Sequence, residues 1–276
     1  MSINLTETLG MTEKTNKRYP LTEEERVFFD DNGYLILKGV LPDDVVTLAL
    51  EKVDDLWRKH KQKEPESQSI HLFDFVEEED FFLNLLDWDK TITKVVNLLS
   101  SNIFLFHSHL DVNLPGEQPL PIEKLEWHRD SDIIEMDLNV LKTHMFSVKV
   151  SYWLSDVSKP NRGNLLIIPG SHKMERSSLS KADFEKAVPM LVAPGDAVFF
   201  DRRVWHARSP NISSVTRKAL FYGYSFRWLA SRDIFRRHKK TDNPVWNQLL
   251  GCYEDPRSRY KPNLKDLPMG IWDVDR

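Results

Sequence analysis

Cysteine is almost missing from this chain of 276 residues, in which Cys252 is the single one. A single cysteine excludes an intramolecular disulfide, and a chain of this length without disulfides is typical of a reducing compartment. The stretch from Met1 to Tyr19 is polar and has no apolar core of the kind found in secretory signals. We therefore expect a cytoplasmic protein whose residues 1–19 form a mobile tail.

Long basic runs and long apolar runs are missing as well. The net charge is −4 and lysines and arginines are not clustered, so we do not expect nucleic acid as a partner. No apolar run approaches membrane-spanning length, so we expect no membrane association. The apolar share of 41% and the aromatic share of 11% are sufficient for a sizeable core. We expect one domain over residues 1–276, as a monomer or a homodimer.

Helical patterns fill the front of the chain, residues 20–103, which we expect to buttress a sheet. Thr22 and Glu25 form a capping-box pattern for a helix that stops at Asn32-Gly33, before a short strand at 34–37. A second helix is expected from Pro42, with a loop at 60–69, and helical spacing returns over 80–99. The apolar positions of the second helix are Val46, Leu50, Val53 and Trp57.

From Phe104 the apolar period changes to two, which is typical of strands. One face of the first strand carries polar side chains at alternating positions: His107, His109, Asp111 and Asn113. Further strands are expected at 145–154, 165–168, 191–192, 197–200 and 220–226, with a short helix within 171–188. We therefore expect a mainly β fold with flanking helices, a core over residues 104–228, and a C-terminal cap over 229–276 with helical potential at 245–250.

Three separated residues point to a metal site. His128 and Asp130 are two positions apart, so on a strand both side chains leave the same face. With His206 they make a set of two histidines and one carboxylate, which suits non-haem Fe(II) because coordination positions stay open. Arg217 follows His206 by eleven residues. Its planar guanidinium could hold the far carboxylate of a dicarboxylate by two parallel hydrogen bonds.

At these residues the sequence resembles the phytanoyl-CoA dioxygenase (PhyH) family of Fe(II)/2-oxoglutarate-dependent oxygenases, from about Glu23 to Trp228. A bare His-x-Asp is weak support, but the ordered set is specific. The matching segments are Asn32-Gly33-Tyr34-Leu35-Ile36, His128-Arg129-Asp130, Gly163-Asn164-Leu165, Ile168-Pro169-Gly170-Ser171-His172, Pro194-Gly195-Asp196, Phe199-Phe200, His206, Ser209-Pro210-Asn211 and Arg217.

The resemblance implies a double-stranded β-helix, which is a cupin-like jelly roll, and a single dioxygenase domain. It implies Fe(II) at His128, Asp130 and His206, and the cosubstrate 2-oxoglutarate at Arg217. Further cosubstrate contacts are expected at Asn113, Ser209 and Ser151, with Tyr152 as an alternative to Ser151. Residues 116–126 and 131–144 are candidates for a lid over the substrate.

The reaction implied by the resemblance is oxidation of a small molecule. O2 and 2-oxoglutarate would be converted to succinate and CO2 while the substrate is hydroxylated, with desaturation and ring closure as other outcomes. Related halogenases carry a small residue at the position of Asp130, so the carboxylate favours hydroxylation over halogenation. Which small molecule is the substrate stays open.

Several alternatives stay open beside this hypothesis. His109-Leu110-Asp111 is a second His-x-Asp on a strand face, although its context does not match the family. With Asn113, its residues could line the pocket floor facing the cosubstrate or substrate, or form hydrogen bonds within the barrel. Arg129 could contact substrate or form an exposed ion pair, and Arg208 is undecided. His172 is expected to be a loop hydrogen-bonder. The aromatic residues expected in the core are Trp127, Trp153 and Trp205.

Two other functions compete with the oxygenase hypothesis. A catalytically silent jelly roll that binds a small molecule or a partner would usually lack one ligand or the arginine, and this chain keeps all four. A cupin-like metalloenzyme without a cosubstrate would need a third histidine ligand and would give Arg217 no role.

Overall fold

The computed structural model describes residues 19–140, 144–175, 179–233, 241–253, 255–262, 265 and 267–272. The chain divides into two compact units, one of Thr22–Phe73 and Ser108–Gly223, the other of Met1–Leu21, Asp74–His107 and Tyr224–Arg276. The expected tail over 1–19 lies outside the described residues except for Tyr19. A single dioxygenase domain over the whole chain stays a prediction.

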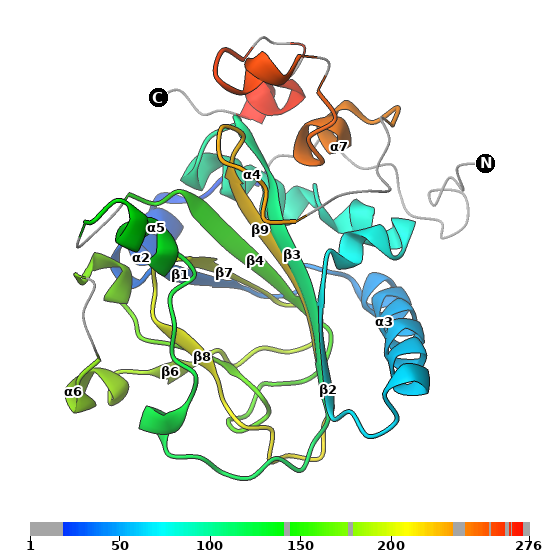
Figure 1. Ribbon diagram of the computed structural model, residues 1–276, viewed down its shortest axis with the longest axis vertical. Coiled ribbons are helices and arrows are strands. Elements are labelled where there is room, and N and C mark those ends of the chain that lie inside the picture. Colours follow the sequence, from blue (N-terminus) through cyan, green and yellow to red (C-terminus); the bar gives the residue numbers. More distant parts are fainter. Residues whose placement is uncertain are drawn as a thin grey trace. The chain divides into compact units, whose positions relative to one another are not determined.

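Antiparallel strands form two sheets (Figure 1). The larger sheet has the order β1-β7-β4-β9-β3-β2 and the smaller has the order β6-β5-β8. The strands are β1 Tyr34–Leu37, β2 Ser69–Phe73, β3 Ile103–Asn113, β4 Ser147–Trp153, β5 Leu165–Ile167, β6 Val188–Pro189, β7 Ala197–Asp201, β8 His206–Arg208 and β9 Arg217–Phe226. The prediction of a mainly β core is confirmed.

One apolar core lies between the two sheets. It takes side chains from β4, β7 and β9 of the larger sheet and from β5 of the smaller: Trp153, Val198, Phe200, Ala219, Phe221, Leu165 and Ile167. Because side chains alternate along a strand, the positions next to these point to the opposite face of the large sheet. The inner faces of β4 and β9 therefore also carry Lys149 and Arg217, two positively charged side chains in an otherwise apolar layer.

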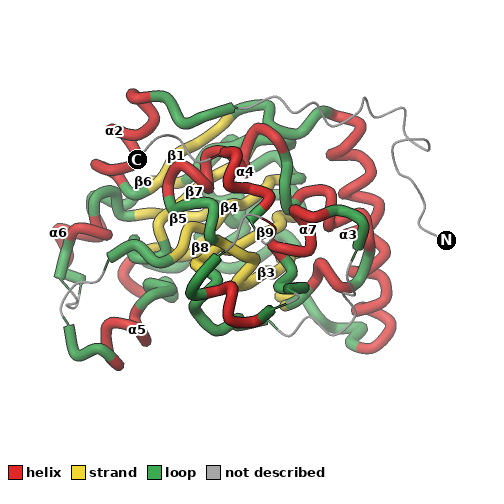
Figure 2. Tube along the Cα trace, turned by 90° about the horizontal axis from the view of Figure 1, so that it is seen from above, coloured by secondary structure: helices red, strands yellow, loops and turns green. Residues whose placement is uncertain are grey.

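Helices begin where the capping pattern of the sequence predicts. In α2 (Glu23–Asn32) the Thr22 side chain accepts a hydrogen bond from the Glu25 amide, and the Glu25 side chain caps in return. The helix stops at Gly33, whose φ of 77° is a left-handed conformation that glycine adopts without strain. Figure 2 shows α2 and α3 (red) outside the strands (yellow) of their own unit.

The second helix differs from its prediction. α3 (Asp43–Lys63) runs to Lys63, so the loop expected at 60–69 begins later, and β2 then occupies Ser69–Phe73. Its buried stripe is Val45, Val46, Ala49, Val53 and Leu56, whereas Leu50 and Trp57 are half-buried. Three basic residues, His60, Lys61 and Lys63, lie in the last turn of the helix. Positive charge at a helix C-terminus interacts favourably with the helix dipole, which is consistent with the extra polar turn.

The unit that contains residues 74–107 and 224–276 is mostly helical turns. The helix expected over 80–99 is interrupted: η2 (Asp80–Leu85) is a 3-10 helix and α4 (Asp89–Leu98) follows it. Helical potential at 245–250 is confirmed by α7 (Pro244–Leu249). Among the residues of this unit that the structure describes, the other helical turns are η1 Phe75–Glu77, η5 Pro256–Arg259 and η7 Pro268–Trp272.

Short elements join the strands of the other unit. They are η3 Ile122–Lys124, α5 Asp132–Asp137, η4 Ser171–Lys173 and α6 Lys181–Phe184, so the short helix expected within 171–188 is confirmed. Residues 191–192 were expected to be a strand, and this is wrong, since Val192 makes only an isolated bridge to Val157. No helix among the described residues is long and apolar enough to cross a bilayer.

Candidate metal and cosubstrate site

The two predicted histidine ligands lie side by side because their backbones pair. His128 and His206 form an isolated antiparallel bridge, with both N–H···O distances at 3.0 Å. Their ring centroids are 4.3 Å apart. The expectation that His128 and Asp130 share one strand face holds only in part, since the backbone at Asp130 has already entered a turn. The turn nevertheless brings the Asp130 carboxylate to both rings.

The three side chains are spaced as metal ligands are. His128 Nε2 lies 3.9 Å from Asp130 Oδ1, and His206 Nε2 lies 3.8 Å from Asp130 Oδ2. One ligand atom from each of the three lies within 4.8 Å of the others. These distances are too long for hydrogen bonds. Since metal–ligand distances are about 2.0–2.2 Å, neighbouring ligand atoms of one ion stand roughly 3–4 Å apart.

Both imidazole rings are oriented for coordination through Nε2. His128 Nδ1 lies 2.9 Å from the Glu126 carbonyl oxygen, and His206 Nδ1 lies 3.0 Å from that of Val204. A carbonyl oxygen only accepts, so each Nδ1 donates, and in the neutral form of either ring the lone pair is then on Nε2. Hydrogen bonds of this kind fix the tautomer of metal-binding histidines. The donor set fits a divalent ion with open positions.

Two buried cations that the sequence analysis missed lie against Asp130. Lys149 Nζ is 2.6 Å from Asp130 Oδ2, and Arg202 Nε is 3.4 Å from the same oxygen. Burial would raise the pKa of the Asp130 carboxyl, but the charges of Lys149 and Arg202 outweigh it and hold that pKa well below its usual value. The sequence does contain a signal for Lys149. It is the single charged residue of the apolar strand β4, and a buried charge needs a partner.

Burial acts in the opposite direction on His206. Removal from water disfavours the imidazolium and lowers the pKa of His206 to about 3, although the Asp130 charge works against this. The ring is therefore neutral near pH 7 and its Nε2 is available to a metal ion. The His128 side chain is 54% exposed, so the three residues are open to solvent on its side.

Arg217 lies at the start of β9, buried on the inner face. One of its terminal nitrogens, Nη1, donates to Asp111 Oδ2 at 3.0 Å and to Asn113 Oδ1 at 2.8 Å. Its Nε is buried and has no hydrogen-bond partner among the described residues. Lys218, the next residue, points the other way, and its Nζ lies 2.5 Å from Asp54. Arg217 thus has an internal carboxylate partner and a donor left over for a ligand.

A glycine makes room for this arginine. At Gly163, whose φ is 71°, a Cβ atom would lie 2.7 Å from Arg217 Cδ. Contacts this short do not occur between carbon atoms, so any side chain at this position would displace Arg217. The glycine of the Gly163-Asn164-Leu165 motif therefore leaves the space that Arg217 occupies.

The predicted cosubstrate contacts are placed unequally. Asn113 Oδ1 accepts a hydrogen bond from Arg217, and Ser209 Oγ is buried with no hydrogen-bond partner among the described residues, so Ser209 has a group left for a ligand. Ser151 shares the inner face of β4, but its Oγ already donates to the Val198 carbonyl and accepts from Trp153 Nε1. Tyr152, the alternative, points to the opposite face and packs edge-on against Tyr222.

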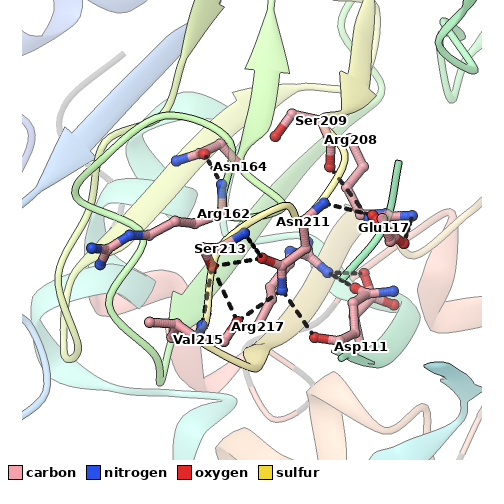
Figure 3. A network of polar contacts seen from close by, with 11 residues as sticks. Asp111, Glu117, Arg162, Asn164, Arg208, Ser209, Asn211, Ser213, Val215 and Arg217 are labelled. Atoms are coloured by element: carbon pink, nitrogen blue, oxygen red, sulfur yellow. Dashed lines mark hydrogen bonds and ion pairs between the residues drawn. The ribbon is translucent and has the colours of Figure 1, made fainter. Parts of the chain in front are cut away.

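A second polar network supports the loop that carries Ser209. Arg208 pairs with Glu117 at 2.7 Å, and Glu117 also accepts from the Asn211 amide (Figure 3). The Asn211 side chain in turn donates to the carbonyls of Asn113 and Val215. Arg208, which the sequence left undecided, therefore fixes the loop after β8 to residue 117.

Arg129 is not the exposed ion pair considered as one alternative. Its side chain is 1% exposed and pairs with Asp132 and Glu135 of α5. It also lies over the Trp205 ring. The residue between the two predicted ligands therefore holds α5, within the predicted lid segment 131–144, of which 141–143 lie outside the described residues. Of the three expected core tryptophans, only Trp153 is fully buried; Trp127 and Trp205 are half-buried.

One ring connects the predicted metal ligands with the predicted cosubstrate arginine. The Phe221 ring centroid lies 6.0 Å from Lys149 Nζ, which contacts Asp130, and 5.7 Å from Arg217 Cζ. The His109 ring also stacks on Phe221, with ring centroids 4.3 Å apart. Both groups therefore face the same apolar layer of one unit. His172 binds the Asp30 carbonyl through Nε2 at 3.1 Å, which agrees with its expected loop role.

Comparison with known proteins gives consistent findings. The family model described as Phytanoyl-CoA dioxygenase (PhyH) matches residues 29–219. Ectoine dioxygenase of Stutzerimonas stutzeri is 22% identical, over 90% of this chain and 87% of that protein. The peroxisomal phytanoyl-CoA dioxygenase of Homo sapiens is 23% identical, over 72% of this chain and 67% of that protein.

Two solved structures share the fold. EctD from S. alaskensis, determined with 2-oxoglutarate and 5-hydroxyectoine, has a TM-score of 0.62 at 20% identity, covering 79% of this chain and 80% of that one. HygX from Streptomyces hygroscopicus, with nickel and 2-oxoglutarate bound, has a TM-score of 0.61 at 20% identity, covering 76% and 89%. The predicted jelly-roll core is thereby confirmed.

Proposed function

The chain belongs to the phytanoyl-CoA dioxygenase family of Fe(II)/2-oxoglutarate-dependent oxygenases, and from this membership we propose that it oxidises a C–H bond of a small molecule. In this proposal His128, Asp130 and His206 hold Fe(II), and Arg217 holds 2-oxoglutarate. Hydroxylation is the expected outcome, with desaturation and ring closure as the other reactions of the same class. Cytoplasmic location and a monomeric or homodimeric state stay predictions.

The observation that carries the proposal is the orientation of the two histidines around Asp130. Each Nδ1 is taken by a backbone carbonyl, each Nε2 faces the carboxylate at 3.8–3.9 Å, and His206 is held neutral. Two imidazole nitrogens and one ionised carboxylate oxygen are the ligands that a non-haem Fe(II) oxygenase requires. No hydrogen bond between the carboxylate and either ring explains why the three side chains converge, since both distances exceed hydrogen-bonding range.

The bound iron, with 2-oxoglutarate and O2, supplies the oxidant for the substrate C–H bond and yields succinate and CO2. The residues of the chain bind, orient and shield. Arg217 anchors the far carboxylate of the keto-diacid through charge-assisted hydrogen bonds, with Asn113 and Ser209 within the same region. Lys149 and Arg202 keep Asp130 ionised at neutral pH, which preserves a negatively charged ligand. Phe200 and Phe221 present apolar walls that exclude water.

A small-molecule substrate is proposed because curated relatives are named for such molecules, ectoine and phytanoyl-CoA. The segments flanking the site suit a lid that closes over one. The apolar side chains of Leu120, Ile133, Met136 and Leu138 are more than half exposed. Apolar side chains at such exposure on short segments are typical of surfaces that cover a ligand. Arg129 ties the α5 part of this lid to the chain between the proposed ligands.

A catalytically silent binding protein is the second candidate. The observation in its favour is that Arg217 already has Asp111 as a partner at 3.0 Å, so the guanidinium is not free for a dicarboxylate alone. Against it stand the buried Arg217 Nε and Ser209 Oγ, which have no hydrogen-bond partner among the described residues. Buried donors of this kind cost stability unless a ligand satisfies them.

Anaerobic calorimetry separates the two candidates. The chain loaded with Fe(II) is titrated with 2-oxoglutarate, and the titration is repeated with Arg217→Gln and with Lys218→Gln as the matched control. The oxygenase proposal predicts binding to the wild type and the control and loss of binding in Arg217→Gln. A panel of small molecules is then assayed for succinate release. Absence of 2-oxoglutarate binding by the Fe(II)-loaded wild type would overturn the proposal.

A further inference from the structure

A second group of metal-binding side chains lies on the β2–β3 ladder. His71 of β2 stands directly opposite Asp111 of β3 in the antiparallel register, and Phe73 stands opposite His109. His109 and Asp111 are two positions apart, so they share one face of β3. Side chains directly opposite each other on antiparallel strands have Cβ atoms about 4.5–5.5 Å apart. The register therefore gathers two imidazoles and one carboxylate.

This group is as closely gathered as the first, but its carboxylate also lies within hydrogen-bonding distance of one ring. One ligand atom from each of His71, His109 and Asp111 lies within 4.8 Å of the others. His71 Nδ1 is 2.5 Å from Asp111 Oδ1, and the two imidazole ring centroids are 4.5 Å apart. Ligand atoms of one ion stand roughly 3–4 Å apart. Side-chain rotations that move the ligand atoms by about 1 Å would therefore place all three around one ion.

The surroundings hold the ligands in place. The His109 ring is stacked on Phe221 at 4.3 Å with an interplanar angle of 11°, and the His71 ring packs edge-on against Phe73 at 4.5 Å. Arg217 donates a hydrogen bond to the other carboxylate oxygen of Asp111, Oδ2, and so holds the carboxylate in place. Burial would raise the pKa of Asp111, but His109, His71 and Arg217 lower it, so the ligand oxygen is ionised.

Access from solvent is also present. The His71 side chain is 49% exposed, whereas that of Asp111 is 14% exposed. An ion could therefore enter beside His71 and keep water in its remaining positions. A cross-strand His–Asp hydrogen bond explains the pair His71 and Asp111. It does not explain why His109 adds a second imidazole on the same face, within ligand distance of both.

We propose that His71, His109 and Asp111 form a second metal site, for a divalent first-row transition ion such as Zn²⁺ or Ni²⁺. Two imidazole nitrogens and one carboxylate oxygen suit such ions. The site shares no residue with His128, Asp130 and His206. Asp111 is also the ion-pair partner of Arg217. A cation bound to Asp111 would therefore weaken the attraction between that carboxylate and the guanidinium. This link to the cosubstrate rests on the proposed function, whereas the metal site itself does not.

Zn²⁺ alone is the probe for the first experiment. The metal-free full-length chain is dialysed against Zn²⁺, and bound metal is counted by elemental analysis. Wild type is expected to bind two ions per chain. The pair of substitutions His128→Ala and His206→Ala should leave one, and His71→Ala with His109→Ala should also leave one. All four together should leave none. His60→Ala, which removes a histidine of α3 outside both groups, should leave two.

Co²⁺ provides the second readout, since its visible absorption reports the ligands. In the His128→Ala/His206→Ala background, Co²⁺ is expected to give a spectrum that is lost on adding His71→Ala. That single substitution removes a half-exposed ring, so circular dichroism should show an unchanged fold, and affinity should fall about 10-fold or more. The proposal is overturned if that background binds no ion, or if it binds one with the same affinity after His71→Ala.

Discussion

Replacing Arg217 with glutamine separates two tasks of this side chain. Arg217 is 2% exposed and pairs with Asp111, which is itself largely buried. Removing one partner of a buried ion pair costs about 3–5 kcal/mol because the other charge is left behind. Asp111 keeps His71 as a second partner, so we expect the lower end, about 3 kcal/mol of unfolding free energy.

The same substitution should weaken 2-oxoglutarate binding. Loss of a buried charge that holds a ligand carboxylate costs about 2–5 kcal/mol, which is about 30-fold or more in Kd. Adding Asp111→Asn should restore most of the stability, because no buried charge is then unpaired. It should not restore 2-oxoglutarate binding. A double-mutant cycle of this kind isolates the pairwise term.

The assays are urea unfolding of the metal-free chain and anaerobic calorimetry with the Fe(II)-loaded chain. Lys218→Gln is the control, since its partner Asp54 lies on α3 and the pair is partly exposed. We expect that control to change stability by about 0–1 kcal/mol and to leave Kd unchanged. An Arg217→Gln variant with wild-type affinity for 2-oxoglutarate would refute the cosubstrate role. Unchanged stability in that variant would refute the buried ion pair.

Four further outcomes are expected. Asp130→Asn should abolish succinate release. Because Asp130 also neutralises Lys149 and Arg202, the substitution should lower the unfolding free energy of the metal-free chain by about 2–4 kcal/mol, measured by urea unfolding. Adding Lys149→Met should recover part of that loss. Gly163→Ala should raise the Kd for 2-oxoglutarate while Fe(II) binding is kept, since the new Cβ would displace Arg217; equal loss of both would contradict the steric reasoning. Arg129→Met should free α5 and speed its proteolysis while the metal ligands stay intact, and an unchanged cleavage rate would speak against the anchor. In the presence of a chelator, thermal stability should fall as the pH drops from about 6.5 towards 3. In that range His206 is protonated in the unfolded chain but not in the folded chain, where its pKa is about 3. His206→Gln should flatten this pH dependence, and an identical dependence in both proteins would count against a neutral buried ring.

Much of the fold was predictable because local signals agree with the tertiary structure. The capping box at Thr22, the glycine stop at Gly33 and the period-two pattern from Phe104 all correspond to observed elements. β2 was missed because none of its residues is buried: one face is exposed and the other only half-buried, so its apolar signal is weak. The break between η2 and α4 was missed because apolar spacing continues through both segments.

The candidate site was predictable where spacing carried it. His128, Asp130, His206 and Arg217 follow from order and separation along the chain. Lys149 and Arg202 were not found, because only the three-dimensional structure shows that both point to Asp130. The His71 contribution to a second cluster depends on the β2–β3 register, which no local pattern specifies. Strand pairing therefore limits what this sequence alone can predict.

An anaerobic crystal structure of the chain with Fe(II) and 2-oxoglutarate tests the central claim most directly. We expect one ion bound by His128 Nε2, Asp130 and His206 Nε2, with the far carboxylate of 2-oxoglutarate on Arg217. An ion held elsewhere, or a 2-oxoglutarate whose carboxylates do not touch Arg217, would contradict it.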